Sequence, residues 1–223
     1  TGADNNAFGQ GALLSNTTGD SNVAIGHDTL LANTTGSSNT AVGNFSLDAN
    51  ITGADNVAVG TYALTRNTTA SRNTAIGTES LDANITGDDN TAVGHDAMQN
   101  TTTGSRNVAV GMSALKSNTT AAYNTALGFE ALEGNTTGNY NIGIGKSAGY
   151  NITDGTRNVI LGYEVRTSSP GGYDQIVLGY NVVGSTHGTL TFGNGGNDTT
   201  CSYGGTTWSA PSDQRLKEEI TTS

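Results

Sequence analysis

The sequence predicts an all-β protein: a parallel β-solenoid, or β-roll, with coils of 17 residues, assembled as an intertwined or side-by-side homotrimer. Three observations carry this prediction: a short segment repeats at a constant step, it alternates as a strand does, and long apolar residues are too few for a thick core. The segment reads Asn-Val-Ala-Ile-Gly at residues 22–26. With small changes it begins at Asn5, Asn22, Asn39, Asn56, Asn73, Asn90, Asn107, Asn124, Asn141, Asn158 and Gln175.

The composition favours a thin solenoid over a globule or a disordered chain. The 223 residues include 32 glycines, and only 34% are hydrophobic and 6% aromatic. Low hydrophobicity is typical of disorder, but the constant step and the β-branched residues at fixed positions argue against it. A step of 17 residues lies just below the periods of roughly 20 to 50 residues of stacked repeat proteins, which indicates a small coil.

Each coil is expected to hold two or three short strands. Residues 22–26 form the first, Gly26 turns the chain, the segment around Leu30 is a second extended or bent piece, and residues 33–36 form the returning turn. A helical turn at residues 28–32 is the competing interpretation, although isolated helices this short are unstable. Strands stacked in parallel at ~4.8 Å would give a rod on the order of 50 Å long.

The stack places equivalent residues above one another. Asn22 is expected to lie on Asn39, so that asparagine and threonine side chains form hydrogen-bonded ladders along the rod. The apolar residues at positions 23, 25 and 30 are expected to line the interior, with Ala and Thr on the remaining faces. Packing copies side by side would bury a second apolar stripe, and closed cyclic symmetry is the usual arrangement, so we expect a parallel homotrimer.

The repeat resembles known fibrous proteins. Asn-Val-Ala-Ile-Gly followed by small residues is similar to the head repeats of trimeric autotransporter adhesins and to shaft repeats of bacteriophage tail fibres. The resemblance covers residues 1 to about 193 and implies a trimeric parallel β-roll. It departs in period, because the adhesin head unit is usually shorter.

The end of the sequence carries the most specific motif. Ser-Asp-Gln-Arg-Leu-Lys-Glu-Glu-Ile at residues 212–220, preceded by Trp-Ser-Ala-Pro at 208–211, resembles the opening of the intramolecular chaperone domain of endosialidases and phage tail fibres. In that family the domain trimerises, folds the fibre and then cuts itself off. The resemblance maps the nucleophile onto Ser212, its partner onto Lys217 and the cut between Pro211 and Ser212.

The chemistry of this motif has two interpretations. A serine hydroxyl needs a base, and a partly desolvated lysine of lowered pKa can supply one. Alternatively, Ser212 and Asp213 cap a helix that runs from Gln214. Both interpretations are compatible.

Three regions follow from these patterns. Residues 1–162 are the 17-residue β-solenoid repeats, 163–211 a degenerate repeat and transition region, and 212–223 the start of a truncated intramolecular chaperone domain. Within the decay of the repeat, Gly149 replaces the expected leucine and Asn151 comes one residue early.

Charge and residue content exclude several classes of function. A formal charge of −10 disfavours nucleic acid, and the sequence has neither an apolar run for membrane insertion nor cysteines beyond Cys201 for an intrachain disulfide. His27, His95 and His187 share no regular partners, so no metal site is expected. We expect no cofactor and, apart from single-turnover self-cleavage, no enzyme.

The function expected is that of a structural or adhesive segment of a phage-like tail fibre or spike on the virion. It would position or contribute to binding of a host cell-surface receptor or glycan, at the rod's end or at variable outward positions such as 27–28, 44–45 and 61–62. One alternative is a bacterial trimeric autotransporter adhesin head on the cell surface. Another is a left-handed β-helix acyltransferase-like enzyme, which the missing six-residue sub-repeat and catalytic histidine disfavour.

Overall fold

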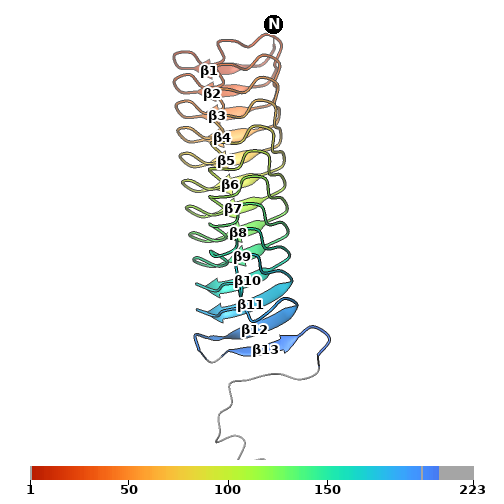
Figure 1. Cartoon of the computed structure of the whole chain (residues 1–223). Helices are drawn as coiled ribbons and strands as arrows, with labels where there is room; N and C mark the ends of the chain where they lie inside the picture. The colour runs from red at the N-terminus through yellow and green to blue at the C-terminus, as the bar shows by residue number, and fades with distance from the viewer. Residues whose placement is uncertain (1, 197, 206–223) are drawn as a thin grey trace, which may run out of the picture.

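The computed structural model describes residues 2–196 and 198–205, which form an all-β rod without a helix (Figure 1). Within this part of the chain, 13 strands form one sheet in sequence order. The strands are β1 (Asn6–Phe8), β2 (Val23–Ile25), β3 (Thr40–Val42), β4 (Val57–Val59), β5 (Thr74–Ile76), β6 (Thr91–Val93), β7 (Val108–Val110), β8 (Thr125–Leu127), β9 (Ile142–Ile144), β10 (Val159–Tyr163), β11 (Gln175–Tyr180), β12 (Thr189–Asn194) and β13 (Thr199–Ser202).

The strands pair in parallel at the step of the sequence repeat, which confirms the parallel β-solenoid with 17-residue coils. Val23 pairs with Thr40, and the same offset of 17 residues holds through β11. From β11 to β12 the offset falls to 14, with Gln175 opposite Thr189. β13 then runs antiparallel to β12, so a hairpin ends the parallel ladder.

Each coil contains one strand in the described residues, so the expected two or three strands per coil are wrong, and the segment around Leu30 is bent and not extended. Residues 27–32 form turns in which Asp28 and Leu30 both adopt positive φ, each at 52°. Because positive φ recurs at every second residue here, residues 28–32 cannot form an α-helix, and the competing helical interpretation is also wrong. Gly26, at φ 142°, turns the chain out of the strand where a Cβ would lie 2.5 Å from the Gly43 carbonyl oxygen.

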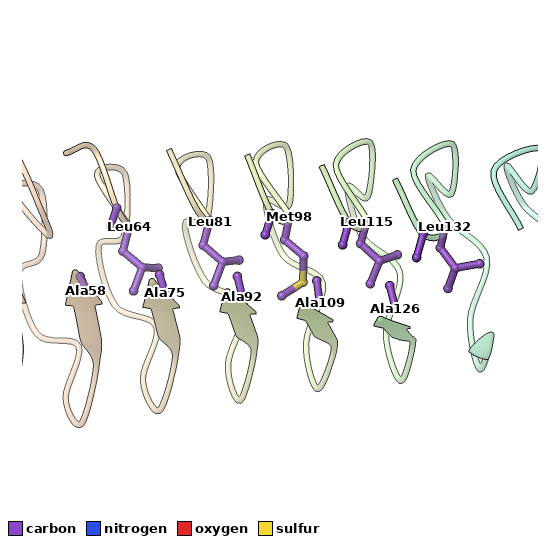
Figure 2. Close-up of a cluster of buried hydrophobic side chains, with 14 of the residues drawn as sticks. Ala58, Leu64, Ala75, Leu81, Ala92, Met98, Ala109, Leu115, Ala126 and Leu132 are labelled. Atoms are coloured by element: carbon purple, nitrogen blue, oxygen red, sulfur yellow. The ribbon is translucent and has the colours of Figure 1, made fainter. Parts of the chain in front are cut away.

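The interior is lined by alanine and leucine, which corrects the predicted orientation of the strand. Ala24 and Leu30 are fully buried, whereas Ile25 is 43% exposed and Val23 is half-buried. Successive residues of a strand point to opposite faces, so only one of the two sets can face inward. Leucine side chains from the turn lie against the alanines of the strands and leave room for no larger side chain there (Figure 2).

Two asparagine ladders run through the buried interior, and the sequence predicts the first of them, formed by Asn22 and its equivalents. The Asn39 amide donates to Asn22 Oδ1 at 3.1 Å, and in the second ladder the Asn50 amide donates to Asn33 Oδ1 at 2.8 Å. The same two amides also donate to the Gly53 carbonyl oxygen, at 2.9 and 3.0 Å. The ladders therefore hold successive coils together and also close each returning turn.

The core changes composition near β9 and β10 without a break in register. A Cβ on Gly143 or Gly149 would lie 2.7 or 2.6 Å from side-chain atoms of Leu132, so glycine is needed for space. Ile152 and Ile160 are fully buried beside them and supply the missing apolar volume. The second asparagine ladder ends here, because Ile152 occupies its next position and is fully buried, while Asn151, one residue earlier, donates its amide to the Thr167 carbonyl oxygen at 3.1 Å.

Candidate interaction surfaces

An apolar stripe runs along the outside of the strands. We call it the strand-face stripe and define it as the first and third residues of each strand from β2 to β9. It contains only Val, Ile, Leu and Thr, without a charged residue. Its most exposed members are Ile25 at 43%, Ile76 at 40%, Val108 at 40%, Leu127 at 47%, Ile142 at 37% and Ile144 at 38%. Exposed apolar surface of this kind is typical of interaction surfaces.

A second column of outward residues, one per coil, forms contacts within the rod. Arg72 donates to Asp89 at 2.6 Å, and the Arg106 guanidinium contacts the Tyr123 hydroxyl. The rings of Tyr123 and Tyr140 stack with centroids 4.9 Å apart. Because each ring covers one face of the other, this pair stabilises the stacking of coils, while Tyr140 remains 55% exposed.

The variable outward positions near the N-terminus also contact one another. His27 meets Phe45 edge to face at 5.3 Å, and Phe45 stacks on Tyr62 at 5.3 Å. Phe45 and Tyr62 project from equivalent turn positions of successive coils, and His27 lies one residue before the equivalent position of the preceding coil. They form a small aromatic cluster on the surface.

A polar pocket of about 260 Å³ lies farther along the rod, on the turn side of the coils that contain β8, β9 and β10. We call it the acidic pocket and define it by its lining residues: Glu130, Glu133, Lys146, Ser147, Tyr150 and Glu164. Three carboxylates and one ammonium group give its lining a formal charge of −2 (three Glu against one Lys).

Several lining side chains of the acidic pocket are held in place by hydrogen bonds. Ser147 Oγ, which is almost fully buried, donates to Glu130 Oε2 at 3.2 Å. Lys146 Nζ donates to Glu164 Oε1 at 3.1 Å and lowers the pKa of that carboxyl, with a further contribution from the Tyr163 hydroxyl. These bonds fix both walls of the pocket before any ligand arrives.

Glu133 is the exception among the lining side chains. The structure gives its carboxylate no hydrogen bond within the described residues. Its pKa is raised, first by burial and then by the neighbouring charge of Glu130, while Lys116 acts in the opposite direction. A carboxylate that is half-buried and unpaired retains its full capacity to accept hydrogen bonds.

The self-cleavage residues predicted from the sequence, Ser212, Lys217 and the bond after Pro211, lie outside the described residues. The three histidines lie in different coils: His27 and His95 each neighbour an aspartate, and His187 stacks on Tyr173. In residues 2–196 and 198–205, no three His, Cys, Asp or Glu side chains come together in a way that could hold a metal ion.

Sequence reasoning missed the acidic pocket. The signal was present only as a cluster of charged or large residues at turn positions in two successive coils, Glu130 and Glu133 followed by Lys146 and Tyr150. No family model, curated protein or solved structure matches the chain. The described part of the chain also holds no helix with the length and apolarity needed to cross a membrane.

Proposed function

We propose that this chain is a structural segment of a phage-like tail fibre or spike, in which three parallel rods assemble into a homotrimer on the virion. The fibre positions, or contributes to, binding of a host cell-surface receptor or glycan. The strand-face stripe is the observation that carries this proposal. It repeats in every coil from β2 to β9, so a second copy in register offers a matching apolar surface along the whole length.

Physical arguments favour copies of the same chain as the partner. The stripe lacks charge, whereas the chain as a whole carries −10, so this face differs from the surface that keeps the rods apart in solution. Closed cyclic symmetry buries an identical stripe on each copy and prevents open-ended growth. The strand-face stripe is equally compatible with a trimeric adhesin head. The terminal motif at 212–220 favours the fibre over that alternative.

The mass of the full chain in solution tests the assembly. Light scattering is expected to give three times the chain mass of 22.6 kDa. Replacing both Ile76 and Leu127 with aspartate is expected to give monomers, because unpaired charges would be buried at the interface. The control replaces Thr69 and Thr120, exposed threonines of the returning turns, with aspartate and retains the trimer. A monomeric parent chain would overturn the proposal.

The terminal motif extends the proposal to assembly by an intramolecular chaperone that then cuts the chain between Pro211 and Ser212. The Ser212 hydroxyl oxygen would attack the Pro211 carbonyl carbon while Lys217 takes the hydroxyl proton; the peptide C–N bond then breaks, the Ser212 nitrogen leaves as an amine with that proton, and water hydrolyses the resulting ester. The gene with its C-terminal continuation is expressed as the parent, as Ser212→Ala and as the control Ser209→Ala. A cleaved fragment from the parent and the control, but not from Ser212→Ala, supports self-processing, and identical masses refute it.

A further inference from the structure

The groove that contains the acidic pocket is bridged by side chains in two coil steps on the N-terminal side of the pocket. It lies between two columns of outward turn residues, those equivalent to Asp28 and those equivalent to Leu31, and side chains 20 residues apart bridge it. The Gln99 amide donates to Glu79 at 2.5 Å, and Lys116 donates to Asp96 at 2.8 Å. In these coils, complementary side chains satisfy each other across the groove.

At the acidic pocket the complementary pairing is lost. The residues 20 apart are now Ser113 and Glu133 in one coil step and Glu130 and Tyr150 in the next, and the structure places no hydrogen bond between the members of either pair. Tyr150 instead accepts a hydrogen bond from Arg166 at 3.2 Å. The acidic pocket lies where such bridging pairs are absent, as they also are between Asp28 and Asp48 and between Tyr62 and Asp82.

The lining chemistry defines the ligand that would fill this opening. Carboxylates supply acceptors for hydroxyl or ammonium hydrogens, and the Ser147 hydroxyl can accept while it donates to Glu130. Tyr150 is 39% exposed at the rim and can contact the apolar face of a ring. With a net charge of −2, the lining repels acids. Its 260 Å³ lies just below the common range for drug-sized ligands, roughly 300 to 1,000 Å³, so it suits a single ring.

We propose that the acidic pocket binds one pyranose residue of a non-acidic surface glycan and prefers an amino sugar whose amine is free. The ammonium group would lie against Glu133 and Glu130, ring hydroxyls would bond to the Glu164 and Lys146 wall, and the ring would pack on Tyr150. This inference rests on the proposed function, since it assigns a site on the fibre to glycan binding.

Titration of the full chain with three monosaccharides tests the ligand class, with binding followed by isothermal calorimetry or ligand-observed NMR. Glucosamine is expected to bind saturably, N-acetylglucosamine at least tenfold more weakly, and galacturonic acid not at all. Equal binding of galacturonic acid, or no saturable binding of any of the three, would overturn the proposal.

Matched variants locate the binding. Glu133→Gln and Glu130→Gln are each expected to weaken glucosamine binding about tenfold or more, because each removes a charge from the pocket. Glu79→Gln makes the same chemical change in the same column three coils away and leaves binding unchanged. Unaltered binding in both pocket variants, with circular dichroism showing that they are folded, would place the sugar elsewhere and refute the proposal.

The failure of this inference is distinguishable from failure of the fibre proposal. A trimer that binds no sugar overturns the assignment of the pocket and leaves the assembly standing. A monomer that binds glucosamine, with the loss in Glu133→Gln, supports the pocket and overturns the trimer.

Discussion

The side-chain oxygen of Asn22 accepts two hydrogen bonds from Asn39, one from the backbone N–H at 2.9 Å and one from the side-chain amide at 3.1 Å. Both residues are fully buried. A buried amide on each coil thus continues the hydrogen-bond ladder of the sheet at the point where the strand begins. In a rod with so little apolar volume, this ladder fixes the position of one coil on the next.

Asn56 provides a test of this ladder in the middle of the rod. It accepts from the Asn73 backbone N–H at 3.0 Å and donates to the Ala70 carbonyl at 2.9 Å. Asn56→Leu would leave the Asn73 N–H buried without a partner, whereas the Ala70 carbonyl keeps its hydrogen bond from the Asn67 amide at 3.0 Å. We expect a loss of roughly 1–3 kcal/mol in urea unfolding, the cost of one unsatisfied buried donor. Thr52→Leu, at an exposed position of the same coil, should change stability little, and equal losses would contradict the role of the ladder.

The orientation of the strands makes a second prediction, at adjacent residues. Ala92 is fully buried, while Thr91 is half-buried on the outer face of the same strand. Ala92→Leu adds volume where the interior is already filled by leucine and is expected to cost about 1–3 kcal/mol or more. Thr91→Leu should stay within about 0.5 kcal/mol in the monomer, as surface substitutions usually do. The reverse order in thermal or urea unfolding would show that the strand faces the other way.

The repeat and its register could be predicted from the sequence because each coil restates the same residues at the same step. The side of the strand that faces inward could not. Alternation separates Ala24 from Val23 and Ile25, but does not say which set is inside. The decisive fact is the turn, where Leu30 adopts positive φ and fills the interior against the strand. Because positive φ is expected mainly at glycine and asparagine, the leucine at position 30 did not indicate this conformation.

The acidic pocket could not be predicted from the sequence for a different reason. It depends on residues of two different turn positions, three apart within a coil, that face each other from successive coils, so the 17-residue period alone does not bring them together. The apolar stripe, by contrast, consists of residues that the sequence analysis had already singled out as packing residues. Their apolar character was recognised correctly, and their position on the outer face makes them available for contacts between chains.

The leucine column gives a third prediction, because Met98 is the one methionine in it. Leu81 and Met98 are both fully buried in equivalent turn positions of adjacent coils (Figure 2). Leu81→Ala removes buried volume and is expected to cost about 2–5 kcal/mol. Met98→Leu conserves volume and should change stability by less than about 1.5 kcal/mol. Urea unfolding checks both, and a large loss in Met98→Leu would show that this coil is shaped specifically for methionine.

Two aspartates, Asp48 and Asp89, are expected to change the stability of the fold with pH in opposite directions. Asp48 shows the less usual direction, because its pKa is raised. Its Oδ1 is buried without a hydrogen-bond partner. Burial is the largest cause that raises its pKa, and Asp28 and Asp82 add to the shift, while the Ala49 backbone N–H opposes it. Since the folded chain then holds this proton more tightly than the unfolded chain, protonation of Asp48 stabilises the fold. Asp48→Asn should therefore be more stable than the parent at pH 7, and the difference should shrink as the pH falls toward the ordinary value of 3.8.

Asp89→Asn serves as the control of opposite sign. Hydrogen bonding to Arg72 lowers the pKa of Asp89, so its carboxylate stabilises the folded chain above the ordinary aspartate pKa and loses that contribution as the pH falls through the lowered value. Asp89→Asn should be less stable than the parent at pH 7, by a small amount because the pair is exposed, and equal to it in strong acid. Urea unfolding at pH 7, 5 and 4 compares the three chains. A stability difference for Asp48→Asn that stays constant across this range would show that the substitution acts through packing and not through charge.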